Sequence, residues 1–436
     1  MLVCFPFLVG AISAVAYGQS PSPSAGVEPP LRLALHDAEQ LALKNNPQIT
    51  VAKLLTLAQG ELTREVRAAE LPQASGNLTA VDPREGSRIT AGGLNNPILF
   101  QRAAGGVTIG QLITDFGRTS NLVASQKLRE RAGKDAERAT AADIVLAVDQ
   151  AFFQALEAQS LLNVAQQTVD TRQFTADQIQ ALANAKLKSD LDLSFAKVNL
   201  AQAKLLQLDA QNRHEATLSQ LNEILGFEKQ ASYELIDETS KPLLQPSENE
   251  EDLVSLALRS RPDLAELDDQ WQAAERFRRA EHDLQRPVVS ALGAVGGTPV
   301  RDHQLASSAW YGAAGVNVNI PIFNGFLFSA RAKEADYRSS VLKEQVRGLR
   351  DRIARDVRLT WLQANTAFQR LSVSEQLLQQ ANLALDLAQT RYKIGLSSIV
   401  ELSQAQLQQT EAAISNTNAR YDYQSALAAL TYQTGQ

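Results

Sequence analysis

Side chains that commonly carry catalytic or metal-binding chemistry occur in this chain, but their spacing does not assemble a site. The four histidines, His36, His214, His282 and His303, show no HxH or HxxxH spacing, so we expect no metal. The sequence contains no GxSxG, Walker A or GxGxxG motif, the usual signatures of a nucleophile elbow and of nucleotide binding. We therefore expect no cofactor and no enzymatic activity, and a hydrolase is a remote alternative.

The composition favours long helices. The 436 residues are rich in Ala, Leu and Gln, and only 6% are aromatic, which is typical of extended helical proteins. The net charge of −6 gives no basic footprint for nucleic acid. Neither half of the chain contains 18 consecutive apolar residues, so no membrane-spanning helix is predicted.

The N-terminus is typical of an export signal. Residues 2–16 are apolar, and small residues near position 16 fit a signal-peptidase site, so residues 1–18 are predicted to be a signal peptide. No Lys or Arg precedes the apolar part, which leaves the true start codon open. Residues 19–34 are rich in Pro and Ser and are predicted to form a flexible leader. Cys4, the single cysteine, lies inside the signal, so the exported chain would contain no thiol.

The sequence after the leader is a duplication. Residues 42–47 (ALKNNP) return 215 positions later as residues 257–262 (ALRSRP). Further along, the spacing becomes 209 and pairs Val148 with Val357. Copies of about 200 residues are too long to be solenoid units, so they indicate two structurally equivalent halves. The predicted divisions are repeat 1 at 35–226, a connector at 227–250 and repeat 2 at 251–436.

Each repeat contains two short segments in which the hydrophobic period falls to two. The clearest, residues 309–320 (AWYGAAGVNVNI), has one apolar and one partly polar face. With counterparts at about 73–81, 105–113 and 288–296, it gives four predicted strands of roughly the length that a tilted strand needs to cross a bilayer. A soluble hairpin in each repeat explains the pattern equally well. Aromatic residues at the strand ends fit membrane-interface belts or caps of a hairpin core. They are Phe116, Trp310, Tyr311, Phe323 and Phe326.

Long helices occupy most of each repeat. Residues 118–184 and 327–393 contain no proline and one glycine each, which predicts two helices of about 100 Å. A first helix and a return helix of about 50 Å each would match that length if they stacked end to end. The first helices are predicted at 38–71 and 253–285, and the return helices at 190–225 and 399–434. Tight turns at 185–189 and 394–398 would close the far end of each hairpin, opposite the strands.

Together these features resemble the TolC-like outer-membrane efflux family. The resemblance runs from about residue 33 to the end of the chain. It includes the helix–strand–strand–helix–helix order, the ALxxxP segments, and IPIFNG at residues 320–325. Its most specific part is RYKIGLSSIVEL at residues 391–402, which is similar to the family's R-Y-x-x-G-x-x-S/T-x-x-[DE]-L/V pattern.

The resemblance implies a mainly α fold with a small transmembrane β part. Three chains would form a homotrimer, with a 12-stranded outer-membrane β-barrel on a long periplasmic α-helical barrel. The implied partners are outer-membrane lipid, a periplasmic adaptor and an inner-membrane pump. The implied function is passive export of small molecules or polypeptides, in a tripartite efflux or type I secretion system. The alternative is an exported periplasmic coiled-coil scaffold without a channel, which explains the paired strands poorly.

The same resemblance assigns roles near the tips. Glu401 matches an acid that lines the periplasmic constriction, and Asp192 is its counterpart in repeat 1; threefold symmetry would turn each into a cation-favouring ring. The alternative for both is a solvated helix face. Gln404 stands where many members have a second acid and Ser397 where some have Arg, so a gate closed by Arg–carboxylate bridges is not expected. Tyr392 would either hydrogen-bond across the helix seam or pack at a helix end.

The tip turns are implied to contact the adaptor. In repeat 2 the central glycine suits the left-handed conformation that ends a helix. In repeat 1 a lysine stands in its place, which weakens the resemblance there. The two sets are Ala185, Lys186 and Leu187 in repeat 1, and Ile394, Gly395 and Leu396 in repeat 2.

Overall fold

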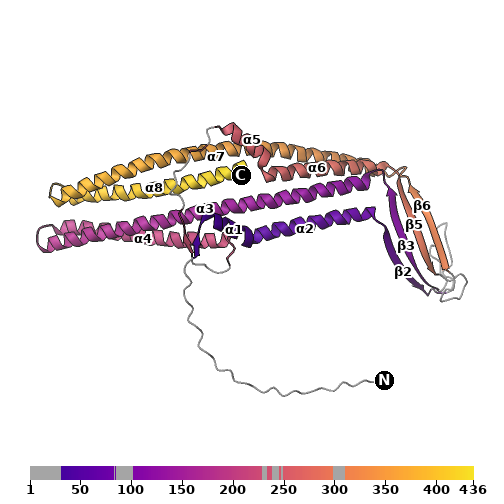
Figure 1. Ribbon diagram of the computed structural model, residues 1–436, viewed down its shortest axis with the longest axis horizontal. Helices are drawn as coiled ribbons and strands as arrows, with labels where there is room; N and C mark the ends of the chain where they lie inside the picture. Colours follow the sequence, from indigo (N-terminus) through magenta and orange to yellow (C-terminus); the bar gives the residue numbers. More distant parts are fainter. Residues whose placement is uncertain are drawn as a thin grey trace, which may run out of the picture.

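A computed structural model shows a bundle of long rods with a small sheet at one end and the C-terminus at mid-height (Figure 1). The described residues are 31–82, 84, 102–227, 233–237, 245–246, 249–297 and 310–436. The predicted signal peptide and most of the leader lie outside them, as do most of the loops between the paired strands.

The helices follow the same order in both repeats. α3 and α7 each contain 67 residues, about 100 Å at the helical rise, with the predicted bounds. Each long helix continues through good helix formers until a left-handed residue follows its end. The helices of repeat 1 are α1 Leu35–Asn45, α2 Pro47–Arg67, α3 Arg118–Asn184 and α4 Asp190–Ile224. Those of repeat 2 are α5 Glu250–Ser260, α6 Pro262–His282, α7 Leu327–Lys393 and α8 Ile399–Thr434.

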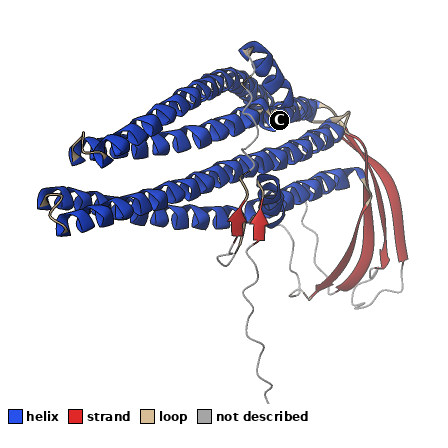
Figure 2. Ribbon diagram, turned by 60° about the vertical axis from the view of Figure 1, so that its left-hand side comes forward, coloured by secondary structure: helices blue, strands red, loops and turns tan. Residues whose placement is uncertain are grey.

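α3 lies in the middle of the helical wall. It contacts α2 and α4 on one side and α6 and α8 on the other, whereas α7 contacts α5, α6 and α8 and forms an edge. Figure 2 shows the same arrangement from a second direction, with the sheet curving away from one end of the helices. Among the described helices, α3 alone is long and apolar enough to cross a membrane by composition. A core helix meets the same criterion, and the contacts of α3 make it a packed helix of the wall.

The core of the wall uses small side chains at repeat-related positions. Val148 and Val357 are both 0% exposed, and so are Ala155 and Ala364. Small side chains let helix axes approach closely, so the wall stays one helix layer wide at each seam. The two repeats are therefore equivalent in which positions are buried as well as in the order of their helices and strands.

Four antiparallel strands form the sheet in the order β2-β3-β5-β6. They are β2 Gln73–Val81, β3 Arg102–Thr114, β5 Val288–Gly297 and β6 Trp310–Asn319. All four were predicted, although β3 begins earlier than expected and its register shifts between Leu112 and Thr114. The β3–β5 pairing joins the repeats, which leaves β2 and β6 as edge strands.

Two short strands were not predicted. β1 Leu31–Leu33 pairs in parallel with β4 Tyr233–Leu235. Leu33 is 1% exposed and belongs to a core cluster with Tyr233 and Phe152. The prediction of a flexible leader as far as residue 34 is therefore wrong at its end. Strands of three residues leave no readable period in a sequence, and long-range packing holds these two in place.

The short helices stack end to end, as their lengths predicted. In repeat 1 the Asn46 side-chain amide donates to the carbonyl of Ile224, the last residue of α4 (2.9 Å). The Asn46 side-chain oxygen accepts from the backbone N–H of Gln48 in α2 (2.9 Å). One side chain thus caps the end of one helix and the start of the next. In repeat 2 the Ser260 hydroxyl donates to the carbonyl of Thr434 at the end of α8 (2.7 Å).

We predict that Asn46→Ala destabilises the chain more than Asn46→Asp. Alanine loses both caps, each worth about 1 kcal/mol, whereas aspartate keeps the acceptor for Gln48 and loses only the donor to Ile224. Urea unfolding in detergent, followed by helical circular dichroism, measures the difference. Equal destabilisation by the two variants would contradict the double role of Asn46.

Candidate functional site

The two faces of the sheet differ in polarity. Residues directly opposite in the ladder share a face, so the register assigns every side chain. One face is apolar, with Leu78 93% and Trp310 85% exposed. Its members include Ala74, Leu78, Val107, Ile109, Ala291, Val295, Trp310, Val316 and Val318. The opposite face carries the polar side chains Ser75, Asn77, Thr79, Thr108, Ser290, Asn317 and Asn319, together with Leu112, Val288, Leu292 and Tyr311. This is the pattern of a transmembrane strand, apolar toward lipid and polar toward water.

Both strand-to-helix junctions make the same sharp turn. Phe116 and Gly117 have φ values of 55° and 106°, and the repeat-related Gly325 and Phe326 have 63° and 65°. The Asp115 carboxylate accepts hydrogen bonds from the backbone N–H groups of Gly117 (3.3 Å) and Thr119 (2.7 Å), which fixes the start of α3. Two consecutive left-handed residues redirect the chain from sheet to helix, and the order of glycine and phenylalanine is exchanged between repeats.

The aromatic residues singled out in the sequence lie at both ends of the strands. Phe116, Phe323 and Phe326 are exposed at the end of the sheet that adjoins the helices. The rings of Phe323 and Phe326 pack edge to face there, with 5.7 Å between their centroids. Trp310 and Tyr311 are exposed at the other end of β6. Their placement at membrane interfaces stays a prediction.

Both tips end in the same backbone motif. The Leu187 N–H donates to the Leu182 carbonyl (2.8 Å), and the Leu396 N–H donates to the Arg391 carbonyl (2.8 Å), as in a Schellman motif. The preceding residue is left-handed in each case, with φ 77° at Gly395 and φ 59° at Lys186. Lys186 therefore adopts the conformation of the glycine it replaces, and the two tips are structurally equivalent despite the difference in sequence.

At the repeat 2 tip, the Glu401 carboxylate pairs with Arg391 of the same chain (3.2 Å). The pair forms because the five-residue turn, 394–398, brings the end of α7 beside the start of α8. An arginine–carboxylate pair was not expected here, because Ser397 and Gln404 replace the residues that would form one in other family members. Gln404 is exposed one turn further along α8. Glu401 is exposed as well, so its second oxygen remains accessible to solvent.

The repeat 1 tip is held against repeat 2. The Lys188 ammonium lies 4.1 Å from the centre of the Tyr392 ring, a cation–π contact between the two hairpins. Burial, and then the nearby Asp192 carboxylate, raises the pKa of Tyr392. The Tyr392 hydroxyl is buried without a hydrogen-bond partner among the described residues. Whether it forms a hydrogen bond across a helix seam or only packs at a helix end stays a prediction. Asp192 accepts from the backbone N–H of Ser189 (3.3 Å) in a capping box at the start of α4.

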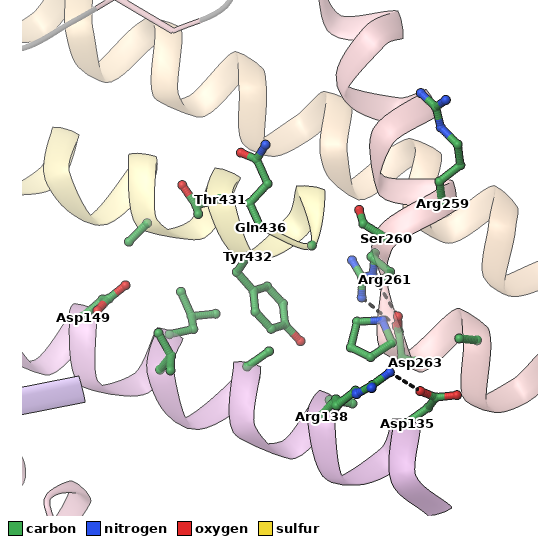
Figure 3. A pocket seen from close by; sticks show the side chains of 18 residues that line it. Asp135, Arg138, Asp149, Arg259, Ser260, Arg261, Asp263, Thr431, Tyr432 and Gln436 are labelled. Atoms are coloured by element: carbon green, nitrogen blue, oxygen red, sulfur yellow. Dashed lines mark hydrogen bonds and ion pairs between the residues drawn. The ribbon is translucent and has the colours of Figure 1, made fainter. Parts of the chain in front are cut away.

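A cavity of about 480 Å³ lies at mid-height in the seam between the repeats (Figure 3). α3, the α5–α6 junction and the end of α8 line it. Its aspartates include Asp135, paired with Arg138 (3.1 Å). Burial, and then the neighbouring Glu39 carboxylate, raises the pKa of Asp149 to about 7. The cavity lining contains three aspartates, Asp135, Asp149 and Asp263, and three arginines, Arg138, Arg259 and Arg261, so a protonated Asp149 leaves it with an excess of positive charge.

Comparison with known proteins identifies the family. The sequence profile described as "Outer membrane efflux protein" matches residues 39–227 and 253–436, which includes both repeats. The chain belongs to the outer membrane efflux protein family. This places it in the outer membrane, with a large periplasmic part, and makes it an outer-membrane efflux duct.

Relatives in the family agree with this assignment. The chain is 24% identical to outer membrane protein TolC of Vibrio cholerae, over 88% of this chain and 86% of that protein. It is 23% identical to TolC of Escherichia coli K12, over 64% of this chain and 59% of that protein. The alignment with the E. coli protein thus spans somewhat more than half of its length.

Solved structures have the same fold. The chain matches CusC, which forms a transmembrane channel, with a TM-score of 0.80, 19% identity and 92% of each chain covered. The open MtrE channel of Neisseria gonorrhoeae gives a TM-score of 0.75 at 18% identity, over 92% of this chain and 88% of that one. These matches confirm the predicted duplicated helix–strand–strand–helix–helix architecture of an efflux-family chain.

Two contacts at the tips of this efflux-family chain were missed in the sequence. Lys188 was not considered because its partner, Tyr392, lies 204 positions away and the sequence contains no pattern that joins them. Arg391 lies inside the tip motif. Its spacing of ten residues from Glu401, across a tight turn between two helices, could have predicted the ion pair. No cluster of His, Cys, Asp and Glu suited to a metal occurs among the described residues.

We predict that Lys186→Gly stabilises this efflux-family chain by about 1 kcal/mol, because glycine adopts the left-handed conformation without the steric penalty of a side chain. The neighbouring Ala185→Gly is the control: Ala185 has φ −79°, so glycine there only adds flexibility to the unfolded chain and destabilises it. Urea midpoints in detergent compare the two. A loss of stability in both variants would contradict the strain assigned to Lys186.

Proposed function

We propose that three copies of this chain close into a continuous duct that carries substrates from the periplasm across the outer membrane. The observation that supports this most is the distribution of exposed apolar side chains over the helical wall. In the inner helices α3, α6 and α8 the exposed large apolar side chains are Phe174, Val400 and Leu407, whereas the edge helices carry many. Those of α2 and α4 include Leu54, Leu57, Phe195, Leu205 and Leu208, and those of α7 include Val341, Leu359, Leu362, Val373 and Leu383.

Extended apolar stripes that are exposed along both edges indicate that another protein surface covers them. The edge formed by α2 and α4 differs from the edge formed by α7, so the contact between copies is head to tail and generates a ring if the rotation closes. A ring of helical walls is a tube with an aqueous interior.

The sheet leads to the same arrangement. Its edge strands β2 and β6 adjoin α2 and α7, the same two edges, and expose unpaired backbone groups. Four strands are too few to close a barrel, whereas three copies supply twelve. The apolar sheet face argues against the alternative of a periplasmic scaffold, which has no use for a lipid-facing surface.

The duct is passive in this proposal. An inner-membrane pump supplies the energy, and a periplasmic adaptor contacts the tips around Lys186 and Gly395, as in a tripartite efflux or type I secretion system. Gating occurs at the tips, where opening separates the hairpins and adaptor contact shifts the closed–open equilibrium.

The trimer is tested by cysteine cross-linking between the two edges. Leu57 and Val341 lie on opposite edges at similar height, since Thr56 contacts Gly133, the repeat counterpart of Leu342. In a Cys4→Ser background, the variant with both Leu57→Cys and Val341→Cys is expected to give covalent dimers and trimers with a short bismaleimide. Each single variant should stay monomeric on denaturing gels, because a head-to-tail contact does not bring a residue beside its own copy. Cross-linked single variants, or a monomer in detergent, would exclude this ring.

Conductance tests the acidic ring at the tip. In planar bilayers, Glu401→Gln is expected to lower the preference for cations, and more so together with Asp192→Asn. Because Arg391 pairs with Glu401, Arg391→Gln should raise the cation preference by leaving three carboxylates uncompensated. Unchanged selectivity in all three variants would remove these residues from the pore.

A further inference from the structure

The contact between the two repeats within one chain, where α3 packs against α6 and α8, indicates how one copy would pack against the next. α3 is flanked on both sides, whereas its repeat counterpart α7 has one covered side and one open side. In the proposed trimer, on which this inference rests, the open side of α7 meets α2 and α4 of the next copy. These helices are the repeat counterparts of α6 and α8, which cover α3 within the chain. Each contact of α3 with α8 therefore has a counterpart between copies, found by shifting both residues by 209.

One contact in the seam lies beside the cavity at mid-height. The Tyr432 hydroxyl donates a hydrogen bond to the Asp143 carboxylate of α3. Figure 3 shows the Tyr432 ring reaching from α8 toward α3. Burial, and then Asp143, raises the pKa of Tyr432 to about 12, so the hydroxyl keeps its proton and remains a donor.

The repeat counterparts of this pair carry opposite charges. Asp143 corresponds to Arg352 in α7, and Tyr432 corresponds to Glu223 in α4. Both side chains are exposed, and the part of the chain that the structure describes offers neither an ion-pair partner. We infer that Arg352 of each copy forms an ion pair with Glu223 of the next copy, three times around the ring.

Neighbouring positions support the correspondence. Ile144 and Ile353, which follow the two α3 and α7 positions, are both buried, at 6% and 1% exposed. Leu221 and Leu430, two residues before the α4 and α8 positions, are buried as well. The side chains that precede or follow the pair thus point into the core in both repeats, and Arg352 and Glu223 have the orientation of Asp143 and Tyr432.

A second contact between the repeats also has polar counterparts at the equivalent positions of the other repeat. Ser160 and Tyr421 share a hydrogen bond between their hydroxyls within the chain (2.9 Å). Their counterparts are Gln369 and Asn212, both exposed, and two amides can hydrogen-bond directly. Nearer the membrane the corresponding residues are not charged. Arg131 and Asp269 form an ion pair within the chain, and their counterparts are Ser340, at an offset of 209, and Leu54, at the offset of 215 that relates the first helices. The inferred seam between copies therefore includes polar pairs at mid-height, among exposed apolar side chains such as Leu359 and Leu362, and is apolar toward the sheet, where Leu54 and Val341 are exposed.

Charge exchange in the full-length chain tests the pair. Glu223→Arg or Arg352→Glu alone is expected to lower the temperature at which the detergent-solubilised trimer dissociates, because each places like charges opposite one another. The double exchange should recover at least half of that shift. Arg350→Glu is the matched control: its repeat counterpart Ala141 packs toward the core of its own repeat, so it should not rescue Glu223→Arg.

Cross-linking gives a second, charge-independent measurement. With Cys4→Ser, the combination of Glu223→Cys and Arg352→Cys should form covalent trimers with a short bismaleimide, and Glu223→Cys with Arg350→Cys should not. A trimer in which the double exchange recovers nothing and this cysteine pair does not cross-link overturns the ion pair and leaves the proposed duct intact. A chain that is monomeric before any substitution overturns both.

Discussion

The structure depends on a match of lengths. Each continuous helix of 67 residues must be covered along its whole height, and none of the described helices that pack on it is long enough alone. Two short helices stacked end to end meet the requirement, and their junction is where Asn46 bonds both helices in repeat 1 and Ser260 bonds Thr434 in repeat 2. Without that junction, orphan carbonyls and N–H groups of two helix ends would face each other at the centre of the wall.

The match of lengths also explains why the two ends of the molecule differ. Toward the membrane, the first helices and the long helices both continue into strands, and two consecutive left-handed residues redirect the chain at each strand-to-helix junction. Toward the tip, only a tight turn is needed, and both repeats use the same Schellman motif although one has lysine and the other glycine. The two tips therefore share one backbone conformation although their residues differ.

Much of the architecture was predictable because it follows from local chemistry. Helix bounds follow from uninterrupted helix formers and the residues that end them, and the strands follow from alternation such as Val316, Asn317 and Val318. Contacts between residues distant in sequence were not predictable. Leu33 pairs across two hundred residues with Leu235, and Lys188 reaches Tyr392 of the other repeat, yet neither carries a local signature. The candidate site was predicted by position, and the pairing of Glu401 with Arg391 came from the three-dimensional turn.

The unpaired backbone of β2 and β6 bears on how the protein is made. An open strand edge pairs with whatever extended chain it meets first, correct or not. For a ring of identical copies, the productive encounter needs two further chains, so native yield rises steeply with local concentration while misassociation competes at every level. In the proposed ring, correct assembly therefore competes with misassociation from the time the strand edges of a copy are exposed until the neighbouring copies cover them.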